Sequence, residues 1–278
     1  MRFVAGQTIL DRYVLERVMA VGGMGTVWTA IDADGTPVAV KLVDDATHDP
    51  SLVIRLAREA ALLARVRHPH VVAMLDHGVV DGQPVLVLEL VAGRTLEVVL
   101  HERGAVARSL AVTWTEQILA GLGALHAAQV VHRDVKPGNV VVAVEEDFVL
   151  KLIDLGVARS LRAGTGRITR DGRTVGSLDY MAPEQMTDAE VDARADIYAA
   201  GIVLYEMVAG HRPSSGLRGA MIRMRIPVTP PEAPPHLPPL PPALVDAIMA
   251  MLALRPDDRP ATAAAAAAAL SEAAALLE

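Results

Sequence analysis

The chain contains 278 residues, 52% of them hydrophobic, and carries a formal net charge of −7 at pH 7. This composition excludes global disorder, and the acidic balance argues against a nucleic-acid partner. The chain has no cysteine, which excludes disulfides and thiolate metal sites, and it shows neither a membrane-spanning apolar run nor a signal peptide. We therefore expect a cytoplasmic protein without a membrane span.

Residues 1–90 combine strands with one helix. Turn residues separate alternating or apolar runs that favour strands, and a run with helical apolar spacing is stopped by Pro69. In chain order, the predicted elements are a hairpin of Tyr13–Val18 with Gly25–Ile31, a strand over Pro37–Leu42, a helix over Ser51–Arg67 and a strand over Pro84–Leu90.

Residues 91–278 are mainly helical outside the loop-rich stretch from Val131 to Asp192, which contains one apolar strand, Val149–Ile153. Ser109 and Asp196 are suitable N-caps for two of the helices, and the proline-rich Arg212–Pro242 predicts an extended loop. The predicted helices are Ser109–Ala128, Asp196–Ala209, Ala243–Leu254 and Thr262–Leu277.

This order of elements indicates the α+β class. A strand-rich lobe, residues 1–90, is followed by a helical lobe, residues 91–278, and together they make one domain. We expect a cleft between the lobes near Glu89–Gly93, because clefts of this kind favour ligand binding.

The octapeptide His132–Asn139, His-Arg-Asp-Val-Lys-Pro-Gly-Asn, is the strongest chemical signal in the sequence. It resembles the catalytic loop of the protein kinase superfamily, and the chain looks nearest to the eukaryotic-like (Hanks-type) serine/threonine kinases of bacteria. The resemblance covers essentially the whole chain, with the motifs in the family's order. It implies a two-lobed fold, with a small β-rich N-lobe containing one main helix and a larger, mainly helical C-lobe. The implied activity is ATP-dependent phosphorylation of serine and threonine hydroxyls on protein substrates.

The resemblance assigns the phosphoryl-transfer chemistry to polar residues of the second lobe. Asp134 would accept or orient the proton of the attacking hydroxyl, and Lys136 would neutralise charge on the γ-phosphate. Asn139 and Asp154 would bind Mg²⁺ (or Mn²⁺), because hard cations favour oxygen ligands. Asp154 opens the tripeptide Asp-Leu-Gly, in which Leu155 stands where the family has phenylalanine.

A lysine on the third predicted strand completes the implied catalytic set. Val-Ala-Val-Lys, ending at Lys41, resembles the family's Val-Ala-Ile-Lys. Lys41 would hold the α- and β-phosphates of ATP, and Glu59 on the predicted helix would fix its ammonium group. On local grounds Glu59 is equally a solvated helix charge, and Asp49 or Glu97 are alternative partners.

The remaining nucleotide contacts also follow from the resemblance. The phosphate loop would comprise Val21, Gly22, Gly23, Met24 and Gly25, whose glycines let backbone N–H groups approach phosphate. Ala20 stands in place of the family's first glycine. The adenine pocket would comprise Val27, Ala39, Val141 and Ile153, with Leu88 as gatekeeper and the backbone of Glu89 and Val91 as hinge. Ordinary core packing explains the apolar residues of this set equally well.

Three scaffold roles are implied in the second lobe. Glu184, which ends Ala-Pro-Glu, would form an ion pair with Arg259. Asp196 would brace the catalytic loop by accepting hydrogen bonds from backbone N–H groups. Ser177 would offer its hydroxyl to Lys136 and Asp134.

Regulation is a further expectation from the resemblance. An arginine directly before the catalytic aspartate, here Arg133, is typical of kinases activated by phosphorylation, and a phosphate supplies charge and acceptors for arginine. Thr169 is the first candidate for the phosphorylated residue and Thr174 the second. The alternative is that both are ordinary solvated loop residues. A homodimer would allow trans-autophosphorylation.

Two other functions remain open at this point. A pseudokinase acting as a nucleotide-binding scaffold is favoured only by Ala20 and Leu155. A kinase-like enzyme for small molecules is disfavoured by the complete segment ending in Ala-Pro-Glu at Glu184. The fold alone would not separate these functions.

Overall fold

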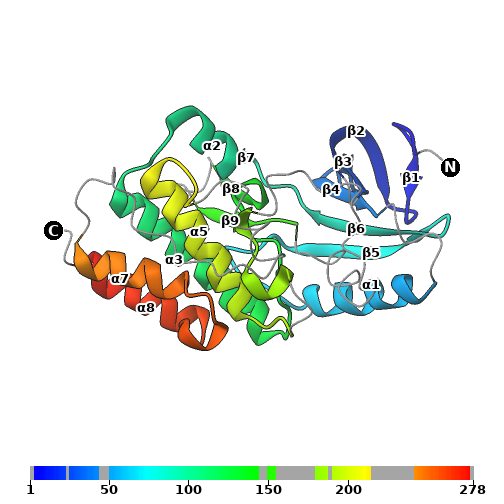
Figure 1. Ribbon diagram of the computed structural model, residues 1–278. Helices are drawn as coiled ribbons and strands as arrows, with labels where there is room; N and C mark the ends of the chain where they lie inside the picture. The colour runs from blue at the N-terminus through cyan, green and yellow to red at the C-terminus, as the bar shows by residue number, and fades with distance from the viewer. Residues whose placement is uncertain are drawn as a thin grey trace. The chain divides into compact units, whose positions relative to one another are not determined.

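The structure is a computed structural model, and it describes residues 3–22, 25–43, 50–143, 149–154, 179–186, 190–213 and 241–275 (Figure 1). The chain divides into two compact units. The N-terminal unit holds Met1–His68 and Val72–Val91, and the C-terminal unit holds Pro69–Val71 and the described chain from Ala92 onward. No helix among the described residues is long and apolar enough to cross a membrane.

The N-terminal unit is built on an antiparallel six-stranded sheet with the strand order β1-β2-β3-β4-β6-β5. One helix, α1, packs against β5 and β6. The elements are β1 (Thr8–Ile9), β2 (Tyr13–Gly22), β3 (Gly25–Ile31), β4 (Pro37–Leu42), α1 (Pro50–Leu63), β5 (Met74–Val80) and β6 (Gln83–Glu89).

The predicted hairpin, third strand and apolar strand are confirmed in this unit. β2 continues beyond its predicted end to Gly22, and α1 ends at Leu63 rather than at Arg67. The sequence analysis did not predict β1 or β5. The second of these, Met74–Val80, carries Asp76, His77 and Gly78 in mid-strand, which breaks the apolar alternation on which strand prediction depends.

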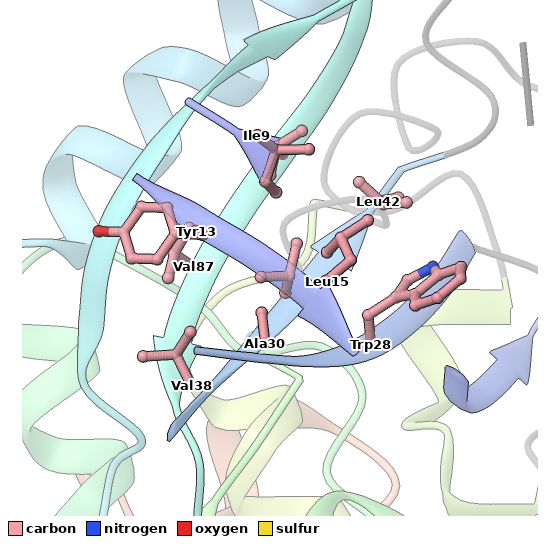
Figure 2. Close-up of a cluster of buried hydrophobic side chains, with 10 residues drawn as sticks. Ile9, Tyr13, Leu15, Trp28, Ala30, Val38, Leu42 and Val87 are labelled. Atoms are coloured by element: carbon pink, nitrogen blue, oxygen red, sulfur yellow. The ribbon is translucent and has the colours of Figure 1, made fainter. Parts of the chain in front are cut away.

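The two faces of this sheet have different compositions. Directly opposite residues of an antiparallel pair point to the same face, so the register Val27↔Lys41 and Ala39↔Leu88 places these four side chains together. The alternate positions form the core cluster shown in Figure 2, which consists of Ile9, Tyr13, Leu15, Trp28, Ala30, Val38, Val40, Leu42, Val85 and Val87. One face is therefore the hydrophobic core, and the other carries the residues expected to bind nucleotide.

The C-terminal unit is mainly helical, with a three-stranded sheet of order β7-β8-β9. Helix α3 packs against α5 and α8, and α7 packs against α5 and α8. The elements are β7 (Gly93–Thr95), α2 (Leu96–Arg103), α3 (Arg108–Ala127), η2 (Pro137–Asn139), β8 (Val140–Ala143), β9 (Leu150–Leu152), η5 (Pro183–Met186), α5 (Arg194–Ala209), α7 (Pro242–Met251), η6 (Pro256–Asp258) and α8 (Ala263–Ala274).

Helix α5 lies in the interior of this unit. Its residues from Ala195 to Tyr205 are all buried, as expected for a helix that is apolar on every side. A Cβ added at Gly201 would lie 2.9 Å from Cβ of Met251, so the missing side chain lets α7 approach closely. The catalytic-loop contacts described below start from this buried helix.

Two predicted helix caps are wrong. Helix α3 has Ala107 at its N-cap position without a side-chain bond, so Ser109 lies inside the first turn. Helix α5 begins at Arg194, and Asp196 lies in its first turn because its carboxylate is used by the catalytic loop instead. By contrast, Thr262 caps α8 by accepting a hydrogen bond from Ala265 N–H at 3.1 Å.

Other predicted boundaries move by a few residues. Helix α7 ends at Met251 rather than Leu254, and the predicted strand Val149–Ile153 is β9. Helix α2 and strands β7 and β8 were not predicted. Most of the predicted loop Arg212–Pro242 lies outside the described residues.

Candidate active site

The catalytic loop folds around the carboxylate of Asp134, which is 7% exposed. Lys136 Nζ donates to Asp134 Oδ2 at 3.0 Å. Asn139 Nδ2 donates to the same oxygen at 3.0 Å and to the Asp134 backbone carbonyl at 2.8 Å. The structure thus brings together three residues that the sequence analysis grouped, and two donors orient one carboxylate oxygen.

Asp196 of α5 holds the backbone immediately before Asp134. Its carboxylate is 1% exposed and accepts from His132 N–H at 2.8 Å and from Arg133 N–H at 2.7 Å. The predicted bracing role is therefore seen in the structure. Arg133 has a φ of 62°, a left-handed conformation that residues other than glycine seldom adopt. This backbone conformation therefore depends on the hydrogen bonds to Asp196.

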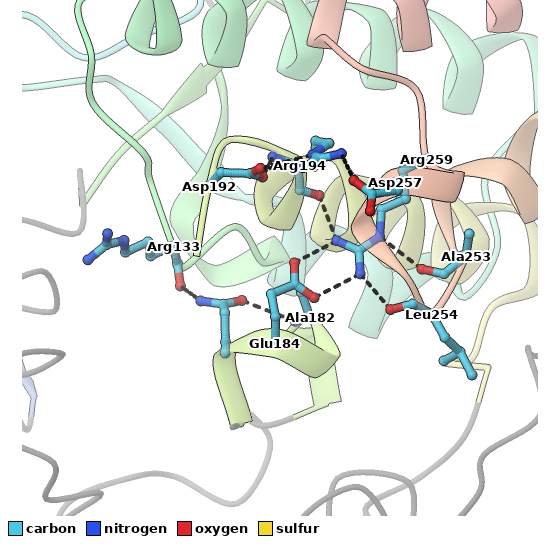
Figure 3. A network of polar contacts seen from close by, with 10 residues as sticks. Arg133, Ala182, Glu184, Asp192, Arg194, Ala253, Leu254, Asp257 and Arg259 are labelled. Carbon is cyan, nitrogen blue, oxygen red and sulfur yellow. Dashed lines mark hydrogen bonds and ion pairs between the residues drawn. The ribbon is translucent and has the colours of Figure 1, made fainter. Parts of the chain in front are cut away.

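The carbonyl of Arg133, which Figure 3 labels, is held by the side chain of Gln185. Gln185 Nε2 donates to this carbonyl at 3.0 Å, and Gln185 Oε1 accepts from Ala182 N–H at 3.0 Å. Arg133 is therefore bonded on both its N–H and its C=O by side chains more than fifty positions along the chain.

Glu184 and Arg259 form the ion pair that the resemblance implied (Figure 3). The pairing is bidentate, with Nη1 to Oε1 at 2.7 Å and Nη2 to Oε2 at 2.8 Å, and both residues are buried. Arg259 also donates to the carbonyls of Ala253, Leu254 and Arg194, which satisfies its remaining N–H groups. Such a pair fixes η5 against the helical core because both charges are fully compensated.

The two expected metal ligands lie on adjoining segments of the C-terminal unit. Ile153 N–H donates to the Asn139 carbonyl at 2.9 Å, which holds Asp154, the next residue, beside the catalytic loop. Asp154 has a φ of 56°, again in the left-handed region. A carboxylate and an amide oxygen suit Mg²⁺, so the donor chemistry of this pair fits the expected ion. Leu155 lies outside the described residues.

Lys41 occupies the centre of the N-terminal sheet on β4. It is 7% exposed and stands opposite Val27 on one side and Leu86 on the other. A buried lysine requires compensation by a charge or by hydrogen bonds. Glu59, its expected partner, lies on α1 in the same unit and is partly buried. Asp49, the first alternative, lies outside the described residues, and Glu97 belongs to α2 of the other unit.

The structure explains why one position of the glycine-rich loop is a glycine. Gly25 has a φ of 137°, and a Cβ added there would lie 1.8 Å from the Leu42 carbonyl oxygen of β4. Its lack of a side chain is therefore required by the close approach of two strands, in addition to the role expected at phosphate. Val21 and Gly22 end β2 and are exposed, whereas Gly23 and Met24 lie outside the described residues.

The expected adenine-pocket residues divide between the two units. Ala39 and Leu88 are cross-strand neighbours in the N-terminal sheet. Glu89 N–H donates to the Ala73 carbonyl at 2.9 Å, and its side chain accepts from Ala73 N–H at 3.1 Å. Val91 is the last described residue of the N-terminal unit, and Val141 and Ile153 belong to the C-terminal unit.

A second polar cluster includes the two residues Asp179 and Tyr180, which stand shortly before Ala-Pro-Glu in the sequence. Tyr180 donates its hydroxyl hydrogen to Glu206 Oε2 at 2.5 Å, and Arg212 pairs with Asp179 while lying 5.8 Å from the Tyr180 ring centroid. Burial and the Glu206 carboxylate raise the pKa of Tyr180. Burial also raises the pKa of Glu206 above its ordinary value, against the opposing effect of the Tyr180 hydrogen bond.

Sequence reasoning missed three residues of this site. His126 Nε2 lies 2.8 Å from Asp196 Oδ2, so it supports the same carboxylate that braces the loop. Gln185 and Glu206 were not singled out either. Gln185 directly follows Ala-Pro-Glu, and its proximity to that motif is the one signal that pointed to it. Ser177, Thr169 and Thr174 lie outside the described residues.

The comparisons agree with these observations. Residues 13–270 match the family model described as the protein kinase domain. The serine/threonine-protein kinase PknL of Mycobacterium tuberculosis is 37% identical over 211 residues, which cover 75% of this chain and 52% of PknL. PknE of Mycobacterium bovis, also named a serine/threonine-protein kinase, is 40% identical over 221 residues, which cover 77% of this chain and 38% of PknE. The chain thus spans about half or less of the length of these relatives.

The fold is shared with a solved structure. The crystal structure of the Mycobacterium tuberculosis PknI kinase domain superposes with a TM-score of 0.77, covering 98% of this chain and 100% of that chain. The two sequences are 24% identical, so this likeness concerns the fold.

Proposed function

The chain belongs to the protein kinase family, and from that premise we propose that it transfers the γ-phosphoryl group of ATP to serine or threonine hydroxyls of proteins. The observation that carries the proposal is the arrangement at Asp134, whose Oδ2 accepts hydrogen bonds from both Lys136 and Asn139. These two bonds fix the direction of the Asp134 carboxylate, as a base for a hydroxyl proton requires.

The residues of the catalytic loop account for the proposed transfer. The substrate hydroxyl oxygen forms a bond to the γ-phosphorus as the bond from that phosphorus to the bridging oxygen of ADP breaks. Asp134 orients the hydroxyl and takes its proton, and Lys136 neutralises negative charge on the transferred group. A Mg²⁺ or Mn²⁺ ion held by Asn139 and Asp154 would supply further charge neutralisation.

The N-terminal sheet supports nucleotide binding in this proposal. Lys41 contacts the α- and β-phosphates, and Glu59 fixes its ammonium group. Val27, Ala39 and Leu88 share the face of Lys41, so they supply an apolar surface of the right kind for adenine beside a buried cation.

The test is phosphoryl transfer by the purified chain from labelled ATP to a generic basic protein. Parallel reactions contain Mg²⁺, Mn²⁺ or EDTA, and acid hydrolysis of the product identifies the labelled amino acid. We expect label on serine or threonine that depends on the divalent ion. Tight ATP binding without transfer under all metal conditions would instead favour the pseudokinase scaffold.

Autophosphorylation in a transient homodimer is part of the proposal. Protein treated with a phosphatase should gain phosphate at Thr169 or Thr174 on addition of MgATP, before its rate rises. The Thr169→Ala, Thr174→Ala double variant should stay slow. Full activity of the phosphate-free double variant would contradict this mode of activation without affecting the assignment of the reaction.

A further inference from the structure

Gln185 connects two segments that must be placed together for transfer. It lies in η5 directly after Glu184, whose carboxylate is fixed by Arg259. From there its carboxamide reaches the carbonyl of Arg133 at 3.0 Å and the N–H of Ala182 at 3.0 Å (Figure 3). One side chain thus bonds both the catalytic loop and its own segment.

The two bonds have opposite polarity. The bond to Arg133 needs a donor on the side chain, and the bond to Ala182 needs an acceptor. A carboxamide offers both groups in one planar unit that stays uncharged at every pH of interest, whereas a carboxyl group offers both only when it is protonated. A carboxylate of the same shape keeps the acceptor, loses the donor, and places negative charge against the Arg133 carbonyl.

The bonded carbonyl is the one whose position matters most. It belongs to Arg133, in the left-handed region with φ 62°, and the peptide that it forms leads directly to Asp134. Asp196 fixes the N–H side of Arg133 with a bond of 2.7 Å. The N–H of the same peptide, on Asp134, donates to His132 Nδ1 of the same loop at 3.3 Å. Gln185 adds a bond from outside the loop, and without it the peptide between Arg133 and Asp134 could rotate more freely and turn the carboxylate away from its orientation.

We propose that Gln185 is a positioning residue that sets the orientation of Asp134 by holding the Arg133 carbonyl, and so makes turnover depend on the anchored Ala182–Gln185 segment. The inference rests on the proposed function, in which Asp134 is the base. The path of bonds runs from Arg259 through Glu184 to Gln185, and from there to the backbone of the catalytic loop.

The decisive variant is Gln185→Glu, assayed for transfer to a protein substrate between pH 4.5 and 8, a range that reaches the ordinary glutamate pKa of about 4.3. At pH 8 the introduced carboxylate cannot donate, and we expect kcat to fall about tenfold while KM for ATP changes less than about twofold. As the pH falls, the introduced carboxyl gains a proton and can donate to the carbonyl. The ratio of variant to wild-type kcat should therefore rise toward acid pH, and this ratio cancels the titration of ATP and of groups common to both proteins.

Several charged or titratable groups surround this position and bear on the introduced carboxyl. They are His132, Arg133 and Asp134 from the catalytic loop, Asp196 from α5, and the Glu184–Arg259 pair. All are present in the wild-type protein as well, so a pH-dependent ratio reports the introduced group.

Gln117→Glu is the matched control. Gln117 Oε1 accepts from Leu150 N–H at 2.8 Å in the same unit, so an introduced carboxylate keeps that bond and adds the same charge. We expect this variant to keep wild-type kcat at every pH. Gln185→Met retains the volume, loses both bonds, and should lose activity without recovering it in acid.

The outcomes separate the two hypotheses. Wild-type kcat in Gln185→Met, or a Gln185→Glu ratio that does not change with pH, overturns the positioning role while the kinase assignment stands. An inactive wild-type protein overturns the proposed function, and the positioning role with it. If Gln185→Glu does not fold, a tenfold loss of kcat at unchanged KM for ATP in a folded Gln185→Met supports the proposal.

Discussion

The N-terminal sheet and the catalytic loop place their functional residues by different means. Lys41 is positioned by the ladder of β4 between β3 and β6, a backbone pattern repeated along every strand. Asp134 is positioned by individual side chains, because Asp196 and Gln185 from distant segments and Asn139 from the loop itself each bond a particular backbone group of the loop. The backbone bonds of a sheet are spread over many residues, whereas the loop is held by a few individual side-chain hydrogen bonds.

The largest effect should come from the loop itself. Asp134→Asn removes the base but keeps the shape, so kcat should fall by about 10²–10⁴-fold while ATP affinity stays within about twofold. Lys41→Met should instead weaken ATP binding, because Lys41 belongs to the sheet that is proposed to bind the nucleotide. Steady-state kinetics and calorimetric titration with a nucleotide analogue measure the two quantities. Equal losses of binding in both variants would remove the distinction between the regions.

The next effect concerns the buried ion pair. Glu184→Gln leaves the buried guanidinium of Arg259 without its counter-charge and should cost about 3–5 kcal/mol of unfolding free energy. Asp257→Asn is the control, because Asp257 pairs with Arg194 but is 72% exposed, and it should cost at most about 1 kcal/mol. Urea unfolding followed by circular dichroism compares them. Similar costs for both would mean that burial does not decide the value of these pairs.

A glycine substitution tests the sheet side. Gly25→Ala would place a methyl group 1.8 Å from the Leu42 carbonyl oxygen, at a φ of 137°, and should cost about 3 kcal/mol or more. Gly35→Ala also has a positive φ, 81°, but no atom within 4 Å. It should cost only about 1–2 kcal/mol. If the two variants unfold at the same urea concentration, β3 and β4 can move apart near Gly25 without loss of unfolding free energy.

The smallest effect is a pH dependence near Tyr180. Burial raises the pKa of Glu206 in the folded protein above its ordinary value of 4.5, so the folded state holds the proton more tightly. The stabilisation is present below the ordinary pKa and is lost as pH rises through the folded pKa. Glu206→Gln still accepts the Tyr180 hydroxyl and should become more stable relative to wild type as the pH rises from about 4.5 toward neutral. A stability difference that is constant over that range would contradict the raised pKa.

The elements that could be predicted are those with a periodic pattern of apolar residues or a contiguous motif. The hairpin, β4 and the helix after it follow from alternation and helical spacing, and the octapeptide ending at Asn139 identified the catalytic loop. The resemblance also supplied the Glu184–Arg259 pair and the role of Asp196, both of which are seen in the structure.

The unpredicted part depends on tertiary contacts. Within the described residues, strand β5 pairs with β6 alone, and it carries polar residues that hide its alternation. His126 contacts the Asp196 carboxylate and Gln185 donates a hydrogen bond to the Arg133 carbonyl. Individual side-chain contacts of this kind produce no periodic pattern in a sequence. Asp196 was assigned as a cap because an aspartate near a helix start usually is one, yet its carboxylate is committed to residues more than sixty positions earlier.

Helix α5 also decides when the catalytic loop can come apart. Its amide hydrogens are enclosed by α3 and α7, so they should exchange with deuterium only when the whole C-terminal unit opens. The N–H groups of His132 and Arg133 donate hydrogen bonds to Asp196 of this helix. The amides of these two residues should therefore exchange as slowly as those of α5. The loop that we propose performs the chemistry should therefore exchange as slowly as this helix, so that other segments of the C-terminal unit can open locally while the loop keeps its shape.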